Sequence, residues 1–159
     1  METTTREPSR QAFFEEWKDI LAPTGFGYRV RILSQLMSRR FQDRLEPFGI
    51  TPFHWVVLCC LWQEDGLPTS AICERLQQVG GTLTGVLDRM EERGLVRRER
   101  DSRDRRIWRV FLTEQGEELM DELPPVVRRV KEETLAGIAE EERALLSRLL
   151  DRTIANLAN

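Results

Sequence analysis

The stretch from residue 83 to residue 113 constrains the fold more than any other part of the chain: LTGVLDRMEERGLVRRERDSRDRRIWRVFLT. It reads as an amphipathic helix, a glycine stop at Gly94, a strand, an arginine-rich tip at 100–106 and a second strand. The tip carries too much charge to be buried, yet apolar strand residues flank it closely on both sides. The pattern predicts a short β-hairpin that projects arginines beside a helix.

The charge distribution agrees with a nucleic-acid contact at this hairpin. Residues 93–109 hold eight arginines against three acidic residues, a net +5, so the overall net charge of −3 leaves −8 on the rest of the chain. A basic patch on an acidic body favours oriented docking over general stickiness. Because hairpin arginines next to a helix can hold a nucleic-acid backbone and probe a groove, the segment indicates a DNA-binding regulator.

The helical signals around the hairpin predict a mainly α fold with a winged helix-turn-helix. Proline, glycine and capping residues divide the apolar runs into helices at 9–21, about 30–46, 52–63, 69–76, 81–93, 114–135 and 140–157. Thr69 or Ser70 is expected to cap the 69–76 helix, Thr113 to cap the 114–135 helix, and Pro125 to kink or break it.

Four parts follow from these signals. We expect a flexible N-terminus at 1–8, N-terminal helices at 9–49, a DNA-binding lobe at 50–113 and C-terminal helices at 114–159.

The core of the chain resembles the MarR family of bacterial regulators. The matching elements are Thr51-Pro52 with Trp55 and Leu58, Leu87-Asp88-Arg89-Met90 with Arg93-Gly94-Leu95-Val96, the tip Asp101–Arg106, and Leu112-Thr113 with Gly116. The resemblance implies a triangular homodimer in which N- and C-terminal dimerisation helices interlock and two winged lobes bind a palindromic operator. Members usually repress; many are released by small anionic, often aromatic, ligands, and some respond to oxidants.

A recognition helix in the major groove needs short polar side chains near its N-terminus, where the backbone can approach DNA. Gly81, Thr82 and Thr84 meet this need, and threonine hydroxyls reach phosphates or base edges. Thr82 is also open to a role as helix cap. Arg89, two turns further on, is expected at a backbone phosphate or as a solvated charge. Gly85 stands where relatives carry a larger polar or basic residue.

The other expected DNA contacts lie in the first short helix and in the wing. Thr69, Ser70 and Gln78 are candidate phosphate clamps. Arg103 and Arg105 are expected to enter a minor groove, where negative potential is concentrated, unless the tip is only a solvated turn. We also count Arg106 among the DNA contacts. Asp104 cannot favour DNA directly, so it is expected to pair with Arg106 and brace the wing.

A ligand site is the least constrained expectation. Family pockets lie between the first long helix, the 52–63 helix and the lobe, so the candidate contacts for a small aromatic anion are Trp17, Arg29, Arg31, His54 and Trp55. Plain packing of the two tryptophans, a structural histidine and surface arginines remain the alternative.

The three cysteines, Cys59, Cys60 and Cys73, have no metal-ligand spacing, and their odd number favours a reducing compartment. We therefore expect a cytoplasmic protein with no metal and no cofactor. Cys59 and Cys60 lie in an apolar run that makes a thiol inert, which disfavours a redox-sensing regulator.

A winged-helix protein-interaction module without DNA binding is the other alternative, against which the intact arginine wing argues. No nucleophile–base pair, paired carboxylates or phosphate loop suggests an enzyme.

Overall fold

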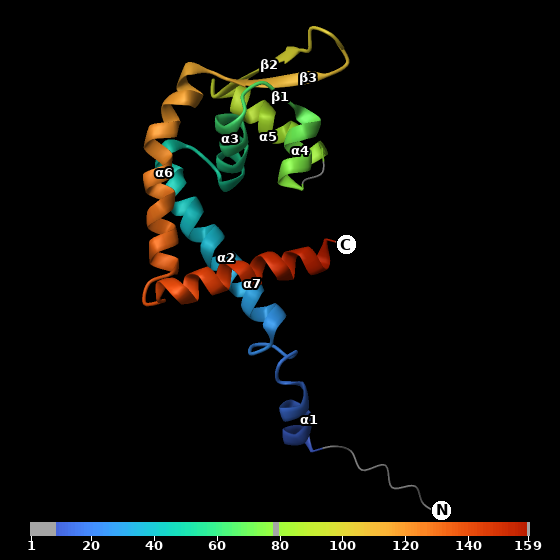
Figure 1. Ribbon diagram of the computed structural model, residues 1–159, viewed down its shortest axis with the longest axis vertical. Helices are drawn as coiled ribbons and strands as arrows, with labels where there is room; N and C mark the ends of the chain where they lie inside the picture. The colour runs from blue at the N-terminus through green and yellow to red at the C-terminus, as the bar shows by residue number, and fades with distance from the viewer. Residues whose placement is uncertain (1–8, 78–79, 159) are drawn as a thin grey trace, which may run out of the picture. The chain divides into compact units, whose positions relative to one another are not determined.

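The computed structural model describes residues 9–77 and 80–158, and the chain divides into two compact units, 1–40 and 41–159 (Figure 1). In the first unit, α1 (Arg10–Trp17) is followed by a turn and by the start of α2 (Phe26–Leu45). Ser9 caps α1 by accepting a hydrogen bond from the backbone N–H of Ala12. The predicted helix at 9–21 was too long, because the backbone N–H groups of Ile20 and Leu21 both turn back to the carbonyl oxygen of Trp17.

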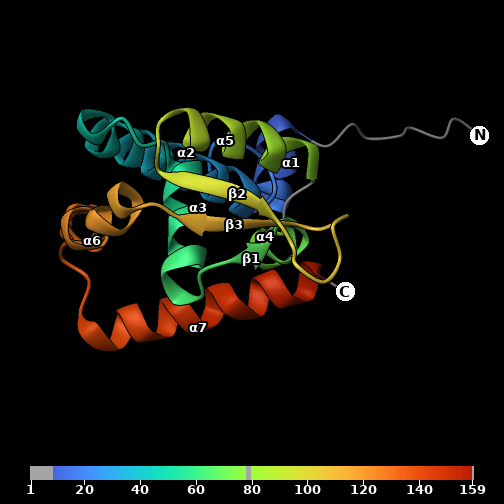
Figure 2. The ribbon, with the colours of Figure 1, turned by 90° about the horizontal axis from the view of Figure 1, so that it is seen from above.

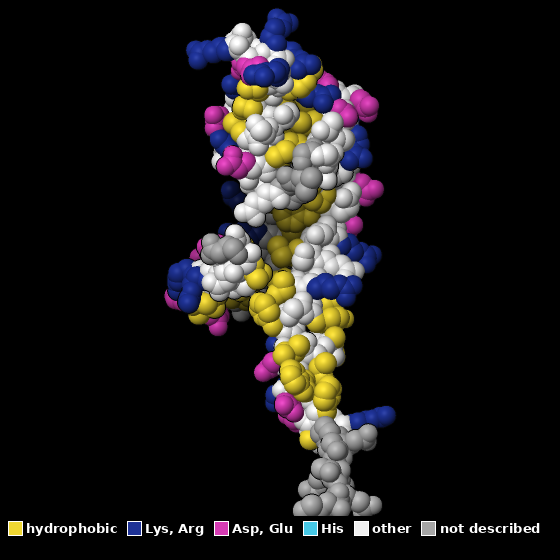
Figure 3. All heavy atoms as spheres, turned by 90° about the vertical axis from the view of Figure 1, so that its right-hand side faces the viewer, with side chains coloured by type: hydrophobic (Ala, Val, Ile, Leu, Met, Phe, Trp, Pro, Cys, Tyr) yellow, Lys and Arg dark blue, Asp and Glu magenta, His cyan; other side chains and the backbone are white. Residues whose placement is uncertain are grey.

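The first unit has no buried apolar core of its own among its described residues. Its large hydrophobic side chains are exposed along α1, the turn and α2, and Figure 3 shows them gathered in the lower part of the view. They are Phe13, Phe14, Trp17, Ile20, Phe26, Val30, Leu33 and Leu36.

The second unit holds the hydrophobic core and the small sheet. After a short turn of 3₁₀ helix (Glu46–Phe48), its elements are α3 (Pro52–Gln63), β1 (Leu67–Pro68), α4 (Thr69–Leu76), α5 (Gly80–Glu92), β2 (Val96–Arg100), β3 (Trp108–Leu112), α6 (Glu114–Thr134) and α7 (Glu140–Leu157). The expected mainly α fold with a wing is confirmed. The predicted bounds of the 52–63 and 140–157 helices are also confirmed.

The sheet is antiparallel, with β3 between β1 and β2 (Figure 2). Alternation places Val110 and Leu112 in the core and leaves Arg109 and Phe111 on the other face. The core also contains Leu58, Leu61, Ile72, Leu83, Leu87 and Met90 from α3, α4 and α5. The helix-turn-helix and the wing are therefore fixed to one apolar centre.

The start of α6 is locked to the rest of this unit at Gly116. A Cβ atom there would lie 2.2 Å from the carbonyl oxygen of Leu95, so only glycine fits. The indole nitrogen of Trp62 donates to the Gly116 carbonyl at 3.0 Å. Thr113 caps the helix, as predicted, by accepting from the Gly116 N–H.

α6 continues past its two prolines. Pro124 and Pro125 both lie inside the single helix Glu114–Thr134, so of the kink or break expected at Pro125 the break does not occur. Leu123 and Val130 on the same helix are buried. Their packing within this unit compensates for the backbone hydrogen bonds that the prolines cannot donate.

Within the described part of the chain, no single helix has the length and apolar content needed to cross a membrane; the bent pair Phe26–Phe48 with Pro52–Gln63 meets that test by length and composition alone.

Candidate nucleic-acid interface

The outward face of α5 is smooth and polar, because its apolar residues all turn inward. Leu83, Val86, Leu87 and Met90 are buried, whereas the expected DNA contacts Gly81, Thr82, Thr84 and Arg89 are exposed. A Cβ at Gly81 or Gly85 would meet nothing within 4 Å. A nucleic-acid groove can therefore approach the helix backbone closely along this face.

α4 presents two of the three expected phosphate clamps at its start. Thr69 is half-buried and Ser70 is exposed. The N-cap of α4 is Pro68, which makes no side-chain cap, so the expectation that Thr69 or Ser70 caps this helix was wrong. Their hydroxyl groups consequently lie within the first helical turn. The third expected clamp, Gln78, lies outside the described residues.

The wing turn is organised around a residue that the sequence analysis did not single out. Asp101 is buried, and its Oδ1 accepts backbone N–H groups from Arg103 at 2.8 Å and Asp104 at 2.9 Å. Its Oδ2 accepts from the guanidinium of Arg109. These contacts, led by the Arg109 hydrogen bond, lower the pKa of Asp101 from 3.8 to about 2. An aspartate two and three residues before the bonded N–H groups is a recognisable turn signal.

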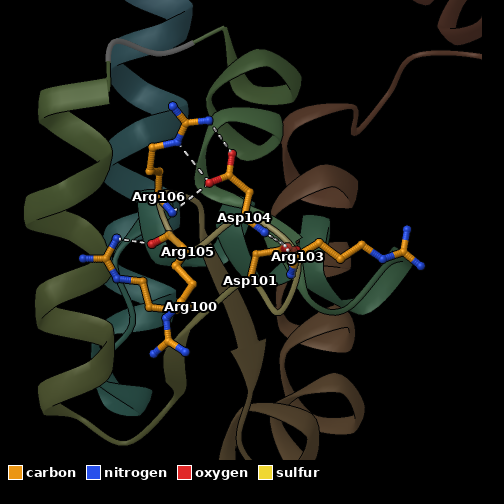
Figure 4. A network of polar contacts seen from close by, with 6 residues as sticks. All are labelled: Arg100, Asp101, Arg103, Asp104, Arg105 and Arg106. Carbon is orange, nitrogen blue, oxygen red and sulfur yellow. Dashed lines mark hydrogen bonds and ion pairs between the residues drawn. The ribbon is translucent and has the colours of Figure 1, made fainter.

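The expected pair between Asp104 and Arg106 is present. Asp104 Oδ1 accepts from the backbone N–H of Arg106 at 3.0 Å and from its Nε at 3.1 Å, and Oδ2 accepts from the guanidinium at 3.1 Å (Figure 4). These hydrogen bonds lower the pKa of Asp104. The Asp104 carbonyl also accepts from the N–H of Ile107, which closes the turn.

Arg103 and Arg105 extend away from this network in different directions (Figure 4). Both are exposed, and among the described residues neither guanidinium has a hydrogen bond or an ion pair. Their positive charges are therefore available to an anionic partner. Figure 3 shows Lys and Arg side chains projecting at the upper end of the view, where the wing lies.

Two arginine–aromatic pairs lie across the wing strands, one on each face. On the core side, the guanidinium carbon of Arg100 lies 3.9 Å from the ring centroid of its cross-strand partner Trp108. On the other side, Arg97 lies 4.7 Å from the ring of its partner Phe111 and pairs with Glu99. Cation–π contact holds each guanidinium against its ring.

Arg98 ties the wing to α5. Its guanidinium donates to Glu91 from Nε at 3.0 Å, and Nη2 lies 2.7 Å from both Glu91 and Asp88. The Arg98 hydrogen bonds lower the pKa of Glu91. Because two carboxylates surround it, this arginine offers little charge to an external anion.

A hollow of about 550 Å³ opens between α4, α5 and the base of the wing. One wall consists of the start of α4, a second consists of α5, and the sheet supplies the third. The lining residues are Thr69, Ser70, Cys73, Leu83, Thr84, Leu87, Arg98 and Trp108.

Comparison with known proteins identifies this arrangement. Residues 50–108, which contain α3–α5, β2 and the wing tip, match the family model described as the MarR family. Over these residues the chain is similar to the MarR family.

Several solved structures match well beyond that domain. A MarR transcriptional regulator from Methanosarcina mazei Go1 is 26% identical, with a TM-score of 0.75 over 82% of this chain and 94% of that chain. MepR of S. aureus, solved as a DNA complex, is 27% identical, with a TM-score of 0.78 over 83% and 97%. BpsR of Bordetella bronchiseptica, whose DNA binding is regulated by 6-hydroxynicotinic acid, is 27% identical, with a TM-score of 0.74 over 80% and 96%.

The residues that the sequence predicted as ligand contacts fall in both units. In the first unit, Trp17 and Arg31 are exposed, and Arg29 lines a hollow of about 300 Å³ on α2 beside Tyr28. In the second unit, Trp55 is half-buried and meets Trp62 edge-to-face at 5.5 Å.

His54 has a local structural contact. Its side chain is buried, and its Nδ1 accepts a hydrogen bond from the backbone N–H of Thr51, while the Thr51 hydroxyl accepts from the His54 N–H. This reciprocal arrangement is a capping box at the start of α3. Burial, with the charges of Arg93 and Arg89, lowers the His54 pKa. A neutral ring is what the cap requires.

The thiols of α3 are poor nucleophiles. Burial raises the pKa of Cys59 to about 11 and also raises that of Cys60. These directions agree with the expectation that an apolar helix makes both thiols inert.

Proposed function

We propose that this protein is a homodimeric, sequence-specific transcriptional repressor that binds a pseudo-palindromic operator. MarR-family proteins regulate transcription by binding DNA. The observation that carries the proposal here is the wing. Two exposed arginines, Arg103 and Arg105, project from a turn that Asp101 and Asp104 hold in place, and neither guanidinium is paired with any described residue. We place its action at the chromosome, and therefore in the cytoplasm.

The proposed docking puts α5 in the major groove and the wing in the adjacent minor groove. The open face around Gly81, Thr82 and Gly85 suits close approach to base edges. Arg103 and Arg105 suit a narrow minor groove, and Arg89 suits a backbone phosphate. In this scheme Arg106 acts mainly through Asp104, because that carboxylate already holds its guanidinium.

Dimerisation is supported by the apolar surface left uncovered on α7. Its exposed hydrophobic residues are Leu145, Leu146, Leu149, Leu150, Ile154 and Leu157. A surface of this kind is unusual on a monomer and marks an interaction site. Leu123 and Val130 of α6 are buried within their own unit, so α7 rather than α6 would supply most of the contact.

A small anionic, often aromatic, effector is a further part of the proposal. It is supported by BpsR, whose DNA binding is regulated by 6-hydroxynicotinic acid. Arg29 is the first residue to test, because it lies beside Tyr28 in a hollow of α2. If a titration of aromatic carboxylates alters operator affinity in the wild type and not in Arg29→Ala, the site includes Arg29; no effect of any such acid on the wild type would remove the effector from the proposal.

The decisive experiment selects duplexes from random or genomic DNA and measures binding across a salt series. We expect enrichment of a pseudo-palindrome and a steep loss of affinity with salt. Arg103→Ala and Arg105→Ala should each weaken the binding free energy by about 1–3 kcal/mol per contact, and a dimer loses each contact twice. Thermal unfolding of both variants should be unchanged. Arg39→Ala on α2 is the matched control and should bind normally. Salt-insensitive or absent DNA binding would favour a protein-interaction module instead.

A further inference from the structure

The hollow between the recognition helix and the wing has no assigned role in the scheme above. It is open, and its sheet wall ends at Trp108, whose side chain is 41% exposed. Trp108 lies on the same face of β3 as the buried Val110 and Leu112, but beyond the edge of the core. An exposed tryptophan beside an unfilled hollow is a candidate contact surface.

The geometry of duplex DNA specifies what would fill this space. Adjacent major and minor grooves are separated by one sugar–phosphate strand. If α5 occupies the major groove and the wing tip enters the neighbouring minor groove, that strand must pass between them. The hollow is bounded by α5 on one side and by the wing base on the other, so it lies where the strand would cross.

We propose that this hollow seats the sugar–phosphate strand between the two grooves, with the Trp108 ring packed on a deoxyribose and the Arg100 guanidinium paired with an adjacent phosphate. The proposal rests on the DNA-binding function proposed above and adds two contact residues to it. Both contacts position the protein on DNA without reading sequence.

Arg100 suits this role better than its neighbour Arg98. Both project on the same face of β2, but Arg98 is neutralised by Glu91 and Asp88. Arg100 stacks on Trp108 and donates one N–H to the carbonyl of Arg105 at 2.8 Å. A guanidinium carries five N–H donors, so others remain for a phosphate. The stack and the hydrogen bond also order the side chain before binding, which reduces the entropy lost on contact.

The other walls fit the alternating chemistry of a nucleic-acid backbone. The hydroxyls of Thr69 and Ser70 lie on the α4 side and can donate to phosphate oxygens. Leu83 and Leu87 on the α5 side are buried, so the apolar surface open to a sugar is chiefly that of Trp108. A free small anion would gain less, because Arg98, the arginine among the described lining residues, is already paired.

The first test compares Arg100→Gln and Trp108→Ala with Arg97→Gln, which alters the arginine–aromatic pair on the opposite face of the same strands. Arg100→Gln and Trp108→Ala should each weaken binding roughly tenfold, equally on the operator and on an unrelated duplex. Arg100→Gln should also reduce the salt slope by about 2 in a dimer, and Trp108→Ala should leave the slope unchanged. Arg97→Gln should bind as the wild type does.

Glutamine keeps a donor for the Arg105 carbonyl, and thermal unfolding of every variant checks that the wing survives. To separate a direct contact from a loosened wing, one operator phosphate at a time is replaced by a neutral methylphosphonate. At the crossing strand, one position should weaken wild-type binding yet have no further effect on Arg100→Gln. Additive losses at every position would overturn the phosphate pairing.

Cys73 provides an independent readout, because it lines the same hollow. Operator DNA should protect Cys73 from N-ethylmaleimide, as followed by peptide mass spectrometry, whereas inorganic phosphate at the same concentration should not. Suppose that the wild type binds DNA, that Cys73 stays equally reactive, and that Arg100→Gln and Trp108→Ala bind normally. The proposed strand contact at the hollow would then be wrong, while the DNA-binding function would stand. If the wild type binds no DNA, the proposed function itself fails.

Discussion

Asp104 is a negative charge on a surface that we place against DNA. Asp104 is expected to favour binding indirectly, because its carboxylate accepts hydrogen bonds from both the backbone and the guanidinium of Arg106. We predict that Asp104→Ala weakens operator binding although it removes a repulsive charge. Operator affinity should fall several-fold, because the pair that orders the wing turn is removed.

Fluorescence anisotropy with labelled operator measures this change. Glu99→Ala, which removes an exposed carboxylate from β2, is the control and should bind equally or slightly better. Tighter binding by Asp104→Ala would show that Asp104 does not brace the wing.

His54 makes the stability of the chain depend on pH. Its folded-state pKa is lowered, so the unfolded chain takes up a proton first as pH falls. Stability is therefore fully present above the ordinary histidine pKa of about 6.5 and decreases as pH falls below it. Denaturant unfolding at pH 7.5 and pH 5.5 should show this loss.

Glutamine at position 54 offers a matched control, because it is a usual partner in a capping box and does not titrate. His54→Gln should keep most of the stability at pH 7.5 and lack the His54 contribution below pH 6.5. An identical pH dependence in both proteins would exclude His54 as its source.

Local polar signals were the most reliable guide at this scale. Thr113 was predicted as a cap and is one, and Thr51 caps α3 in the same way, although the cap predicted at Thr69 or Ser70 is absent. The bond between Asp104 and Arg106 was also predicted. Asp101 was missed because several nearby arginines were equally possible partners in the sequence, and only the register of β2 and β3 selects Arg109.

At the level of elements, α5 is weakened by a glycine in its exposed face. A methyl group at Gly85 would meet nothing within 4 Å, so Gly85→Ala should stabilise the protein by about 1 kcal/mol. Gly94→Ala is the control of opposite sign, because Gly94 has a φ of +69° at the end of α5 and alanine is strained there. Urea unfolding measures both; a destabilising Gly85→Ala would mean that this face is not open.

Element bounds followed the sequence where apolar periodicity and caps agreed, as in α3. They diverged where tertiary contacts decide. β1 has two residues and exists because Leu67 pairs with Val110. β2 extends through charged residues to Arg100, since its exposed positions accept arginine and carry no apolar signal. α6 tolerates Pro124 and Pro125 because the same helix is anchored in the core.

For the whole molecule, the exposed face of α7 makes the oligomeric state testable. We predict a dimer at micromolar concentration, with a mass near twice the 18.6 kDa of one chain by light scattering. Leu149→Glu combined with Ile154→Glu should give monomers, because two buried charges would face the interface. Arg148→Ala on the same helix should leave the dimer intact. A wild-type monomer would contradict the prediction and the palindromic operator with it.

A dimer gives the operator its geometry. Two-fold symmetry requires two equivalent half-sites, with centres roughly 10 base pairs or a near multiple apart. The sequence predicted the winged lobe in detail because its signals are local. Pairing of two chains depends on surfaces whose partner the sequence of one chain does not specify. The predicted dimer therefore rests on exposed apolar area alone.

The close approach of Gly116 to Leu95 joins the start of α6 rigidly to the winged lobe. The joint has no room for sliding, and the Trp62 hydrogen bond pins it from a second side. A helix of 21 residues is about 31 Å long, so a tilt of about 10° of the lobe swings its far end by roughly 5 Å. We therefore expect a displacement at the far end of α6 to move the wing as well. A substitution as small as Gly116→Ala would disturb this joint without altering any residue that we place against DNA.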